Sequence, residues 1–446
     1  MSQRTAPASC GWARPFAAII PAVAAAVLLS TPVTAQKPST SPAIESEAGA
    51  NAGDHLFDIA KVHSLHLSIS AAEWAVLQTS NARGGGAIGG SDYRLADGRL
   101  VHVGSGFAGY FPWAHADMRV DGAAFTDVGL RYKGNLSFMS SSAAAPLAAS
   151  FKLKIDLHGG KGSWDGEKTF NFHAGVVDTS KMREAIAYAV FRAAGVPASR
   201  TAYVEIFFTV PGLYKETSGG LYVMIEDVNK KFLTRVLPPG GGLLMKPEGL
   251  RGGVQDRGDA WASYTPTFRP DREATLHEQQ RVMEFAKLVS QSDVALFRSK
   301  IGTYLDVDEF LRFVAVNALL VNTDSYLNGS HNFYLYLDPK DDKFRFIPWD
   351  LDLALGSRNT GGNVNLLMPL RGDNPLIYWL LDDPANAAKY RAILRELAAT
   401  VFTAAEMTKL CDQLEQAGGG RAVSPRSFIA GQVAYVQQVV AGLGSK

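Results

Sequence analysis

The stretch from residue 321 to residue 356 constrains the fold of this chain most strongly. It contains two apolar runs, residues 333–337 and 344–348, which a charged segment at 338–343 separates. Short alternating runs joined by a polar turn predict a β-hairpin. Polar residues lie just before the first run and just after the second, namely Asn322, Asp324, Asn328, His331, Asn332, Asp350 and Asp352. Because a hairpin brings its two outer ends together, we expect these side chains to meet at one end of a small sheet.

The residue types at this end of the predicted hairpin fit metal chemistry. The carboxylates of Asp324 and Asp350 and the amide of Asn332 offer the hard oxygen ligands that Mg²⁺ favours. A spare carboxylate beside such a metal can take a proton from a substrate hydroxyl group. Asn and Asp are also common in ordinary turns, where their side chains bond to the nearby backbone. Spacing alone leaves both interpretations open, a metal site and a structural hairpin.

Length and composition indicate an ordinary globular protein. The chain has 446 residues, of which 47% are hydrophobic and 20% are charged. That length is enough for about two or three domains, or for one two-lobed enzyme with a sizeable core. The formal net charge of +1 gives no sign of a broad cationic surface, so nucleic acid is not an expected partner. Of the two cysteines, Cys10 lies near the N-terminus, and Cys411 is expected to be a packed free thiol.

The N-terminal segment predicts a secretory signal peptide. Arg4 and Arg14 form its charged region, residues 16–29 its apolar run, and the small residues 33–35 its cleavage site. The apolar run is shorter than the about 20 residues that span a membrane, and an uncleaved anchor is the structural alternative. Cleavage near Ala35 predicts a protein that is secreted, periplasmic or at the cell surface. No transmembrane segment is expected in the mature chain.

The first half of the mature chain reads as a linker followed by a sheet-rich domain. Residues 36–60 are rich in Pro, Ser, Ala and Glu and predict a flexible linker. Within the sheet-rich region at 61–228, residues 150–156 alternate between apolar and polar types, so Lys152 and Lys154 share one face. If that face lines a cleft, a lysine there can neutralise phosphate charge. An ordinary solvated strand face is the alternative.

Two further segments of the sheet-rich region carry charge in positions that suit a binding site. Residues 131–137 form a basic turn that can hold phosphates through charge and backbone amides. Residues 178–184 begin a helix, and Glu184 falls on or near its packed side, where a buried carboxylate needs a cation. The strand at 220–225 then runs into a charged helix start, which predicts a hinge before the helix-rich region at 229–446. This order predicts an α+β fold with two lobes.

Seven segments of the chain resemble motifs of the CotH kinase family and occur in the order of that family. They are RYKGN at 131–135, SFKLKID at 150–156, DTSKMRE at 178–184, GLYVMIEDV at 220–228, NTD at 322–324, HNFYLY at 331–336 and PWDLDLALG at 348–356. Each is weak by itself, whereas the ordered set is specific. The resemblance implies an atypical, two-lobed protein-kinase-like fold. Its sheet-rich N-lobe would comprise residues 61–228 and its helix-rich C-lobe residues 229–446.

The resemblance also implies a reaction, the transfer of the γ-phosphate of ATP to a Ser or Thr hydroxyl group with Mg²⁺ or Mn²⁺. The acceptor would be a protein, such as a cell-surface or coat protein. Lys152 or Lys154 would hold the α- and β-phosphates, and Lys152, paired with Glu184, is the preferred candidate. Arg131 and Lys133 would lie at the turn that covers the phosphates.

The remaining roles that the resemblance implies belong to the hinge and the hairpin. Residues 224–228, which include Glu226, would form the hinge against adenine. Asp324 would accept the hydroxyl proton or orient the nucleophile. The metal would be held by Asn328 or Asn332, by Asp350 and, as a second candidate, by Asp352. The chain contains neither an HRD nor a DFG string, and no spacing rule chooses between the two asparagines.

Two other functions are compatible with the sequence. A pseudokinase or surface-binding module would keep the fold for recognition, and secretion to a place where ATP is scarce supports that alternative. The presence of Asp324, Asn332 and Asp350 with a candidate lysine favours an active enzyme. A secreted metal-dependent hydrolase could use Asp350 and Asp352 as paired carboxylates, because residues two apart on a strand point the same way. The chain lacks an aromatic-rich run that suggests a sugar cleft.

Overall fold

The computed structural model of the protein describes residues 53–81, 91–103, 109–134, 136–141, 146–247, 253–328, 331–356, 364–369 and 374–443. All of them belong to one compact unit, Ser41–Lys446. The predicted signal peptide and the predicted linker up to residue 52 lie outside the described residues. Residues 53–60, the end of that predicted linker, are instead packed against the sheet domain, where Leu56 and Phe57 are buried in its apolar core.

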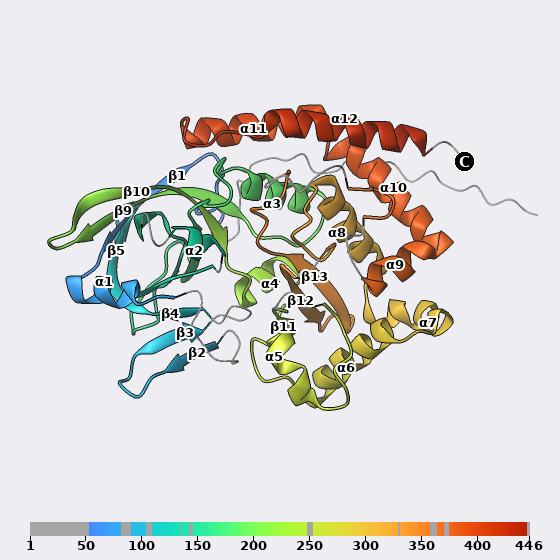
Figure 1. Cartoon of the computed structure of the whole chain (residues 1–446), viewed down its shortest axis with the longest axis horizontal. Helices are drawn as coiled ribbons and strands as arrows, with labels where there is room; N and C mark the ends of the chain where they lie inside the picture. The colour runs from blue at the N-terminus through green and yellow to red at the C-terminus, as the bar shows by residue number, and fades with distance from the viewer. Residues whose placement is uncertain are drawn as a thin grey trace, which may run out of the picture. The chain divides into compact units, whose positions relative to one another are not determined.

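The sheet-rich region forms a closed barrel in the described part of the chain (Figure 1). The strand order around it is β1-β5-β6-β7-β8-β10-β9. The bounds are Val62–Ser68 for β1, Ala114–Val120 for β5, Ala123–Tyr132 for β6, Phe151–Lys154 for β7, Thr169–His173 for β8, Thr201–Val210 for β9 and Tyr214–Glu226 for β10. Neighbouring strands are antiparallel except β1 and β9, which are parallel.

Side-chain alternation decides what the barrel strands bury. In β7 the apolar residues Phe151 and Leu153 point into the core, and the lysines between them lie on the other face. In β8 Phe170 and Phe172 are core residues in the same way, so Asn171 and His173 share the outer face. The outer face of these neighbouring strands is therefore polar and can contribute side chains to a binding site.

Smaller elements surround the barrel. A second sheet has the order β2-β3-β4, with β2 at Ser91–Arg94, β3 at Leu100–Val103 and β4 at Tyr110–Pro112. The helices of this region are α1 at Ala71–Gln78, α2 at Leu136–Ser141, the 3₁₀ turn Pro146–Ala148 and α3 at Arg183–Ala193. Helix α3 is almost entirely buried, because it lies between the barrel and the helical half of the unit (Figure 1).

The predicted hairpin at 333–348 is confirmed. Its strands are β12, Phe333–Asp338, and β13, Lys343–Pro348, and Phe333 pairs with Pro348 at the outer end. A third strand, β11 at Leu243–Met245, adds to the free edge of β12. Both hairpin strands are buried on both faces, which explains why their sequences are almost continuously apolar.

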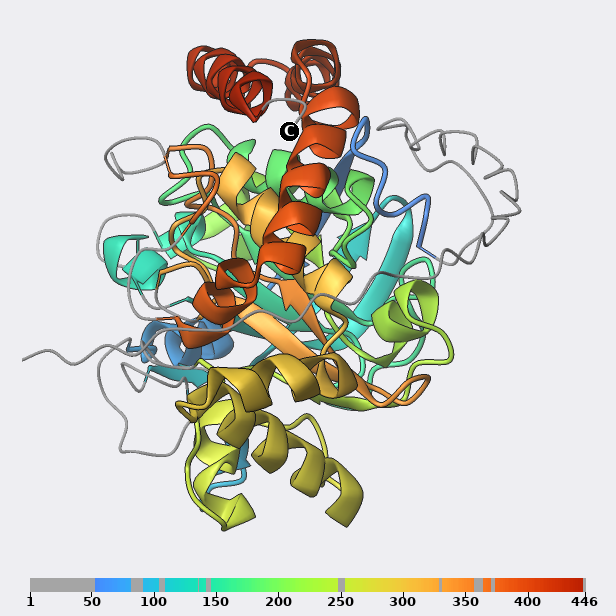
Figure 2. The same cartoon turned by 90° about the vertical axis from the view of Figure 1, so that its right-hand side faces the viewer.

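Helices make up most of the chain beyond the barrel. They are α4 at Lys230–Val236, the 3₁₀ turn Trp261–Ser263, α5 at Thr265–Phe268, α6 at Leu276–Ser290, α7 at Val294–Tyr304, α8 at Val307–Leu319, α9 at Pro375–Asp382, α10 at Pro384–Thr400, α11 at Ala404–Gly418 and α12 at Arg426–Gly442. In Figures 1 and 2 the red helices α11 and α12 lie together along one edge of the unit. No helix within the described ranges is long and apolar enough to cross a membrane.

The observed class is therefore α+β, as the sequence predicts, with a barrel in the first half and helices around a small sheet in the second. Helix α8 begins at the cap Asp306, whose side chain accepts a hydrogen bond from the backbone N–H of Glu309. It ends just before residues 322–324 and so delivers them to the outer end of the hairpin. This chain path places the polar residues around the hairpin next to the polar outer face of the barrel.

Candidate active site

The two ends of the hairpin bring Asp324, Asn332 and Asp350 into one region, as expected. The side chain of Asn332 donates hydrogen bonds to the carbonyl oxygen of Asp324 at 2.7 Å and to its Oδ2 at 3.1 Å. The N–H of Trp349 donates to the carbonyl oxygen of Asn332 at 3.1 Å, which fixes the residue before Asp350. Nε2 of His331 donates to Oδ1 of Asp324 at 2.9 Å. The carboxylate of Asp324 is thus held in place from two sides.

Backbone conformation supports a site at this position. Asn332 has a φ of 57° and Asp350 a φ of 56°. Both values lie in the left-handed region, which residues other than glycine rarely adopt. Asn and Asp tolerate this region better than other residues do, but the conformation still has a free-energy cost of about 1–3 kcal/mol. Such strain concentrates at functional sites, where a side chain has to be aimed in one direction.

A second group of side chains reaches the same region from the barrel. His173 lies at the end of β8 and Glu184 in the first turn of α3. Nδ1 of His173 lies 2.8 Å from Oε2 of Glu184, and Nε2 of His173 lies 2.5 Å from Nζ of Lys133. Because an ammonium group only donates, Nε2 accepts from Lys133 and the Nδ1–H donates to Glu184. The imidazole therefore connects a lysine to a glutamate.

The electrostatics of this group follow from burial and from neighbouring charges. Loss of hydration, together with the charge of the nearby Lys133, lowers the pKa of His173 to about 3, so the ring is neutral. Burial lowers the pKa of Lys133 to about 7, against the opposing effect of Asp350. Burial and the charge of Asp350 raise the pKa of Glu184 well above its usual value. The charge of Asp350 thus acts on both Lys133 and Glu184, in opposite directions on their charged forms.

Asp352 belongs to the same concentration of acidic groups. Burial raises the pKa of its carboxyl group well above the usual value, and the charges of Asp350 and Glu184 raise it further. Asp178 and Asp324 act on Asp352 in the same direction. Like charges this close favour either protonation or a bound cation. The structure thus brings together Asp324, Asn332, Asp350 and Asp352, four of the residues that the sequence singled out.

The expected ion pair between Lys152 and Glu184 is wrong. Nζ of Lys152 lies 2.6 Å from Oδ1 of Asp227, which also accepts a hydrogen bond from Asn171 at 2.9 Å. Burial would raise the pKa of Asp227, but the charge and the hydrogen bond of Lys152 outweigh it and lower the pKa to about 2. Lys152 is paired with Asn171 in the barrel register and so faces the end of β10. The lysine that reaches Glu184, through His173, is Lys133.

Three predicted residues lie apart from this group. Lys154 has Nζ 3.6 Å from Oδ2 of Asp92 and 5.3 Å from the ring centre of Trp113, and Arg131 lies over the same ring at 4.9 Å. Glu226 is 3% exposed, and its carboxylate bonds to two arginines rather than facing the hinge. Successive residues of a strand point to opposite sides, so its neighbour Asp227 is the one that faces the site.

Asn328 is the last predicted ligand, and it is exposed at the end of the described range 253–328. By contrast, Asn332 makes the hydrogen bonds to Asp324 given above, so the geometry favours Asn332 of the two asparagines.

Sequence reasoning missed three residues of the site, whereas Asp227 falls within the predicted hinge at 224–228. The three are His173, Lys246 and Trp349, of which Trp349 packs edge-on against His173 and has the ammonium groups of Lys133 and Lys246 near its ring at 5.2 and 5.6 Å. The alternation in residues 169–173 was a usable signal, since it places Asn171 and His173 on the polar face beside Lys152. Lys246 follows a short strand without any pattern that marks it.

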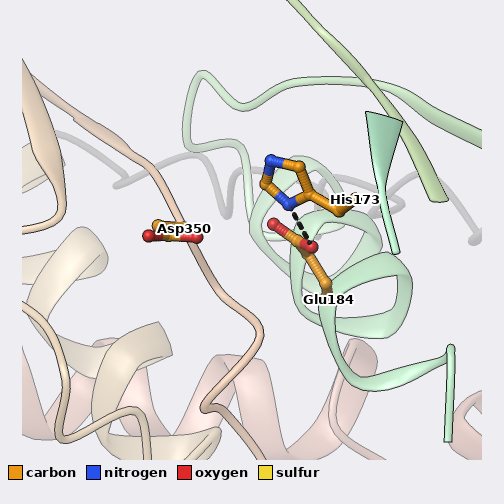
Figure 3. A group of neighbouring side chains, drawn as sticks. All are labelled: His173, Glu184 and Asp350. Atoms are coloured by element: carbon orange, nitrogen blue, oxygen red, sulfur yellow. Dashed lines mark hydrogen bonds and ion pairs between the residues drawn. The ribbon is translucent and has the colours of Figure 1, made fainter. Parts of the chain in front are cut away.

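The donor atoms at this site are of the kinds that bind a divalent cation. His173, Glu184 and Asp350 each offer a donor atom, and these atoms all lie within 4.8 Å of one another (Figure 3). Among the described residues, Oε1 of Glu184 makes no full hydrogen bond, although the backbone amide of Leu351 lowers its pKa somewhat. A buried carboxylate oxygen that has at most a weak hydrogen bond and lies beside further carboxylates has the character of a cation site. The residues therefore fit a divalent cation.

A match to a known protein family shows which family the chain belongs to. The model of the family described as CotH kinase protein matches residues 130–423. The chain belongs to the CotH kinase family. The match begins at β6 and runs through α11, so it includes the site residues of the barrel and those of the hairpin.

Curated members of the CotH kinase family match at low identity. Inner spore coat protein H of Bacillus subtilis is 29% identical over 110 residues, which cover 24% of this chain and 30% of that protein. Invasin CotH7 of Rhizopus delemar is 23% identical over 240 residues, which cover 52% of this chain and 39% of that protein. The chain thus spans well under half the length of these relatives.

Solved structures give only distant similarities. A Shewanella oneidensis complex of HipA, HipB and operator DNA has a TM-score of 0.34 at 12% identity, and the match covers 66% of each chain. The Helicobacter pylori proinflammatory kinase CtkA has a TM-score of 0.26 at 10% identity, and the match covers 65% of this chain and 94% of that chain.

Proposed function

We propose that this protein is a secreted atypical kinase that transfers the γ-phosphate of ATP to Ser or Thr hydroxyl groups of a protein, with Mg²⁺ or Mn²⁺. The observation that carries the proposal is the meeting of Lys133, Glu184, Asp324 and Asp350 in one region. Phosphoryl transfer depends on positioning, metal ions and positive charge more than on covalent chemistry by the protein, and this set supplies those parts. Membership of the CotH kinase family supports the same reaction class.

In this proposal the barrel and the helical half are the two lobes of a kinase-like fold. Lys133, rather than Lys152, holds the phosphates, because it is the lysine linked to Glu184 and influenced by Asp350. Asp227, paired with Lys152, lies where the chain leaves the barrel and marks the hinge. Lys246 adds positive charge near Lys133.

The hairpin residues have distinct roles, one toward the acceptor and the others toward the metal. Asp324, held by His331 and Asn332, accepts the hydroxyl proton or orients the hydroxyl group. Asp350 and Asp352 hold the metal with Asn332, and a bound divalent cation supplies charge neutralisation at the phosphate oxygens. The acceptor is a protein such as a cell-surface or coat protein, and the N-terminal segment is a leader that directs the chain out of the cytoplasm.

Calorimetric titration with ATP, with and without Mg²⁺ or Mn²⁺, tests the proposal. We expect metal-dependent binding that Asp350→Asn weakens at least about 10-fold, a loss of about 1.4 kcal/mol. Asp342→Asn, a carboxylate at the far end of the same hairpin, is the matched control and leaves the affinity unchanged. Absence of nucleotide binding with every metal would contradict a kinase and support a binding module that retains the fold.

Asp324→Asn separates binding from chemistry. Because Asp324 acts on the hydroxyl group and not on the nucleotide, this variant should bind ATP normally and lose at least about 100-fold of the transfer rate. The rate is measured as incorporation of labelled γ-phosphate into a candidate acceptor or into the protein itself. Full transfer activity in the variant would remove Asp324 from the mechanism.

A further inference from the structure

The last helix of the chain, α12, packs against the two segments that carry the acidic residues of the candidate site. The family match ends at residue 423, before α12 begins at Arg426. Figures 1 and 2 show α12 beside α11 along one edge of the helical half. Phe428, Gln432 and Tyr435 have the spacing i, i+4 and i+7, so they lie on one face of α12.

Gln432 holds the C-terminal end of α8. Its side chain is 3% exposed, and its Nε2 donates a hydrogen bond to the carbonyl oxygen of Leu319 at 3.1 Å. Leu319 is the last residue of α8, where the carbonyl groups have no partner within the helix. A buried amide has a free-energy cost unless it forms hydrogen bonds. The bond to Leu319 therefore explains a glutamine at a position that packing alone would fill with an apolar residue.

The next carbonyl group of α8 accepts a hydrogen bond from the hairpin exit, which we define as residues 349–356. The backbone N–H of Leu355 donates to the carbonyl oxygen of Leu320 at 2.7 Å. Leu320 lies four residues before Asp324 in the chain. Leu355 lies three residues after Asp352. Two adjacent carbonyl groups thus join α12, the segment that leads to Asp324 and the hairpin exit.

Phe428 packs against the end of the hairpin exit. Gly356 has a φ of 71°, which lies in the left-handed region that favours glycine. A Cβ atom added to Gly356 would overlap the ring of Phe428, so ring and backbone are in close contact. Two turns further along α12, the hydroxyl group of Tyr435 donates to the carbonyl oxygen of Val364 at 3.2 Å. The helix therefore contacts the chain beyond the acidic residues at two points.

We propose that α12 is a positioning element of the active site. Gln432 fixes the segment that leads to Asp324, and Phe428 fixes the hairpin exit, so one helix sets the distance between the proton acceptor and the metal ligands. The helix acts through these two segments. Its effect on phosphoryl transfer rests on the proposed kinase function, whereas the packing contacts are present without nucleotide.

Gln432→Met tests the first contact, because it removes the donor and keeps the length of the side chain. We expect it to lower the rate of phosphate transfer at least about 10-fold, because a displacement of about 1 Å between reacting groups can cost about 100-fold. The affinity for ATP with Mg²⁺ should change by less than about threefold, since Gln432 acts on the segment of Asp324 and not on the metal ligands.

Gln437→Met is the matched control in the same helix. Nε2 of Gln437 donates to the carbonyl oxygen of Ala398 in α10 at 2.7 Å, so the variant loses the same kind of bond at a place away from the site. It should keep the wild-type transfer rate. A stability loss alone would act on both variants alike, which makes their difference the measure of positioning.

Gly356→Ala tests the second contact and leaves Gln432 in place, so it remains informative if Gln432→Met fails to fold. The added methyl group meets the ring of Phe428 and should weaken Mg²⁺-dependent ATP binding at least about 10-fold by displacing the hairpin exit. Adding Phe428→Ala removes the overlap and should recover most of this loss. The backbone strain of alanine at residue 356 is the same in both proteins, so the recovery reports on the contact.

Hydrogen exchange of the backbone amides at 320–325 and 351–356, measured without nucleotide, separates this inference from the kinase proposal. Faster exchange in Gln432→Met than in Gln437→Met would support positioning even in a protein that transfers no phosphate, and only the kinase proposal would then fail. Equal exchange in the two variants would overturn the inference. Equal transfer rates in these two variants, or no recovery of ATP binding in the double variant, would also overturn it and leave the kinase proposal in place.

Discussion

Lys133 is the residue whose surroundings say most about the site. Its ammonium group contacts His173, lies 3.4 Å from Oδ1 of Asn171 and faces the ring of Trp349. Burial lowers its pKa to about 7, and Asp350 is the strongest charge that opposes this decrease. The groups that contact this ammonium group are an imidazole, an amide and an aromatic ring, none of which carries a negative charge. Lys133 can therefore exchange these contacts for a phosphate. Lys152, by contrast, already has a buried carboxylate partner in Asp227.

At this scale we predict that Lys133→Met weakens ATP binding by about 10- to 100-fold, because a charge-assisted hydrogen bond contributes about 1.5–3 kcal/mol. Lys154→Met, on the same face of the barrel but paired with Asp92, should change the affinity by less than about threefold. The measurement is calorimetric titration with ATP and Mg²⁺. A larger effect for Lys154 than for Lys133 would move the phosphate site to the sheet β2-β3-β4.

The hairpin β12–β13 is the element that positions the acidic residues, and a charge cluster around the buried Arg345 connects its turn to α8. Arg345 on β13 lies 2.9 Å from Oε2 of Glu309 and 2.7 Å from Oδ2 of Asp341. Asp306, the cap of α8, is 3.5 Å from the same guanidinium group. One arginine thus joins the hairpin to the helix that delivers Asp324.

The carboxyl group of Glu309 makes this connection sensitive to pH. Burial raises its pKa from 4.5 to about 8, against the opposing charge of Arg345, so the folded state holds the proton more tightly than the unfolded state. The resulting stabilisation is fully present below pH 4.5 and is lost as the pH rises through 8. This stabilisation amounts to a few kcal/mol, because each unit of pKa shift corresponds to about 1.4 kcal/mol.

We therefore predict that Glu309→Gln flattens the fall in unfolding free energy between pH 4.5 and 8. Urea unfolding at several pH values measures this dependence. Asp308→Asn is the control in the same helix turn, because its carboxylate is 67% exposed and pairs with Lys389. An unchanged pH dependence in Glu309→Gln would assign the titration to other groups.

Over the whole molecule, a buried network connects the start of the described chain to the junction between barrel and helices. Arg200 bonds to Asp54 at 2.7 Å and to Glu226 at 2.7 Å, and Arg235 of α4 bonds to Glu226 at 2.6 Å. The side chains of Asp54, Arg200 and Glu226 are all less than 10% exposed. The network therefore fixes the chain where β10 leaves the barrel.

Arg200→Met should lower the unfolding free energy by about 3–5 kcal/mol, because it removes the arginine that bridges the two buried carboxylates of Asp54 and Glu226, of which Glu226 keeps Arg235. Arg421→Met is the matched control, because Arg421 pairs with Glu205 but is 42% exposed. This variant should lower the unfolding free energy by less than about 1 kcal/mol. Urea unfolding monitored by fluorescence measures both. A loss below about 1 kcal/mol for Arg200→Met would show that the network contributes little to stability.

The sequence by itself determined the local structure of the site and its family. The two apolar runs and the polar turn predicted β12–β13 to within a residue, and the alternation in 150–156 placed Lys152 and Lys154 on one face. These patterns are local, because the geometry of a strand or turn depends on residues next to one another. The ordered motifs predicted the CotH kinase family, which the family match confirms.

Only the tertiary structure decided which side chains meet. Period-two alternation gives the face of a residue but not its neighbour across the sheet, which depends on strand register and on closure of the barrel. Register sets Lys152 opposite Asn171 and toward Asp227, and packing of α3 brings Glu184 to His173 and Lys133. Pairings of this kind join residues far apart in the chain, so they become visible only once the barrel, α3 and the hairpin are assembled.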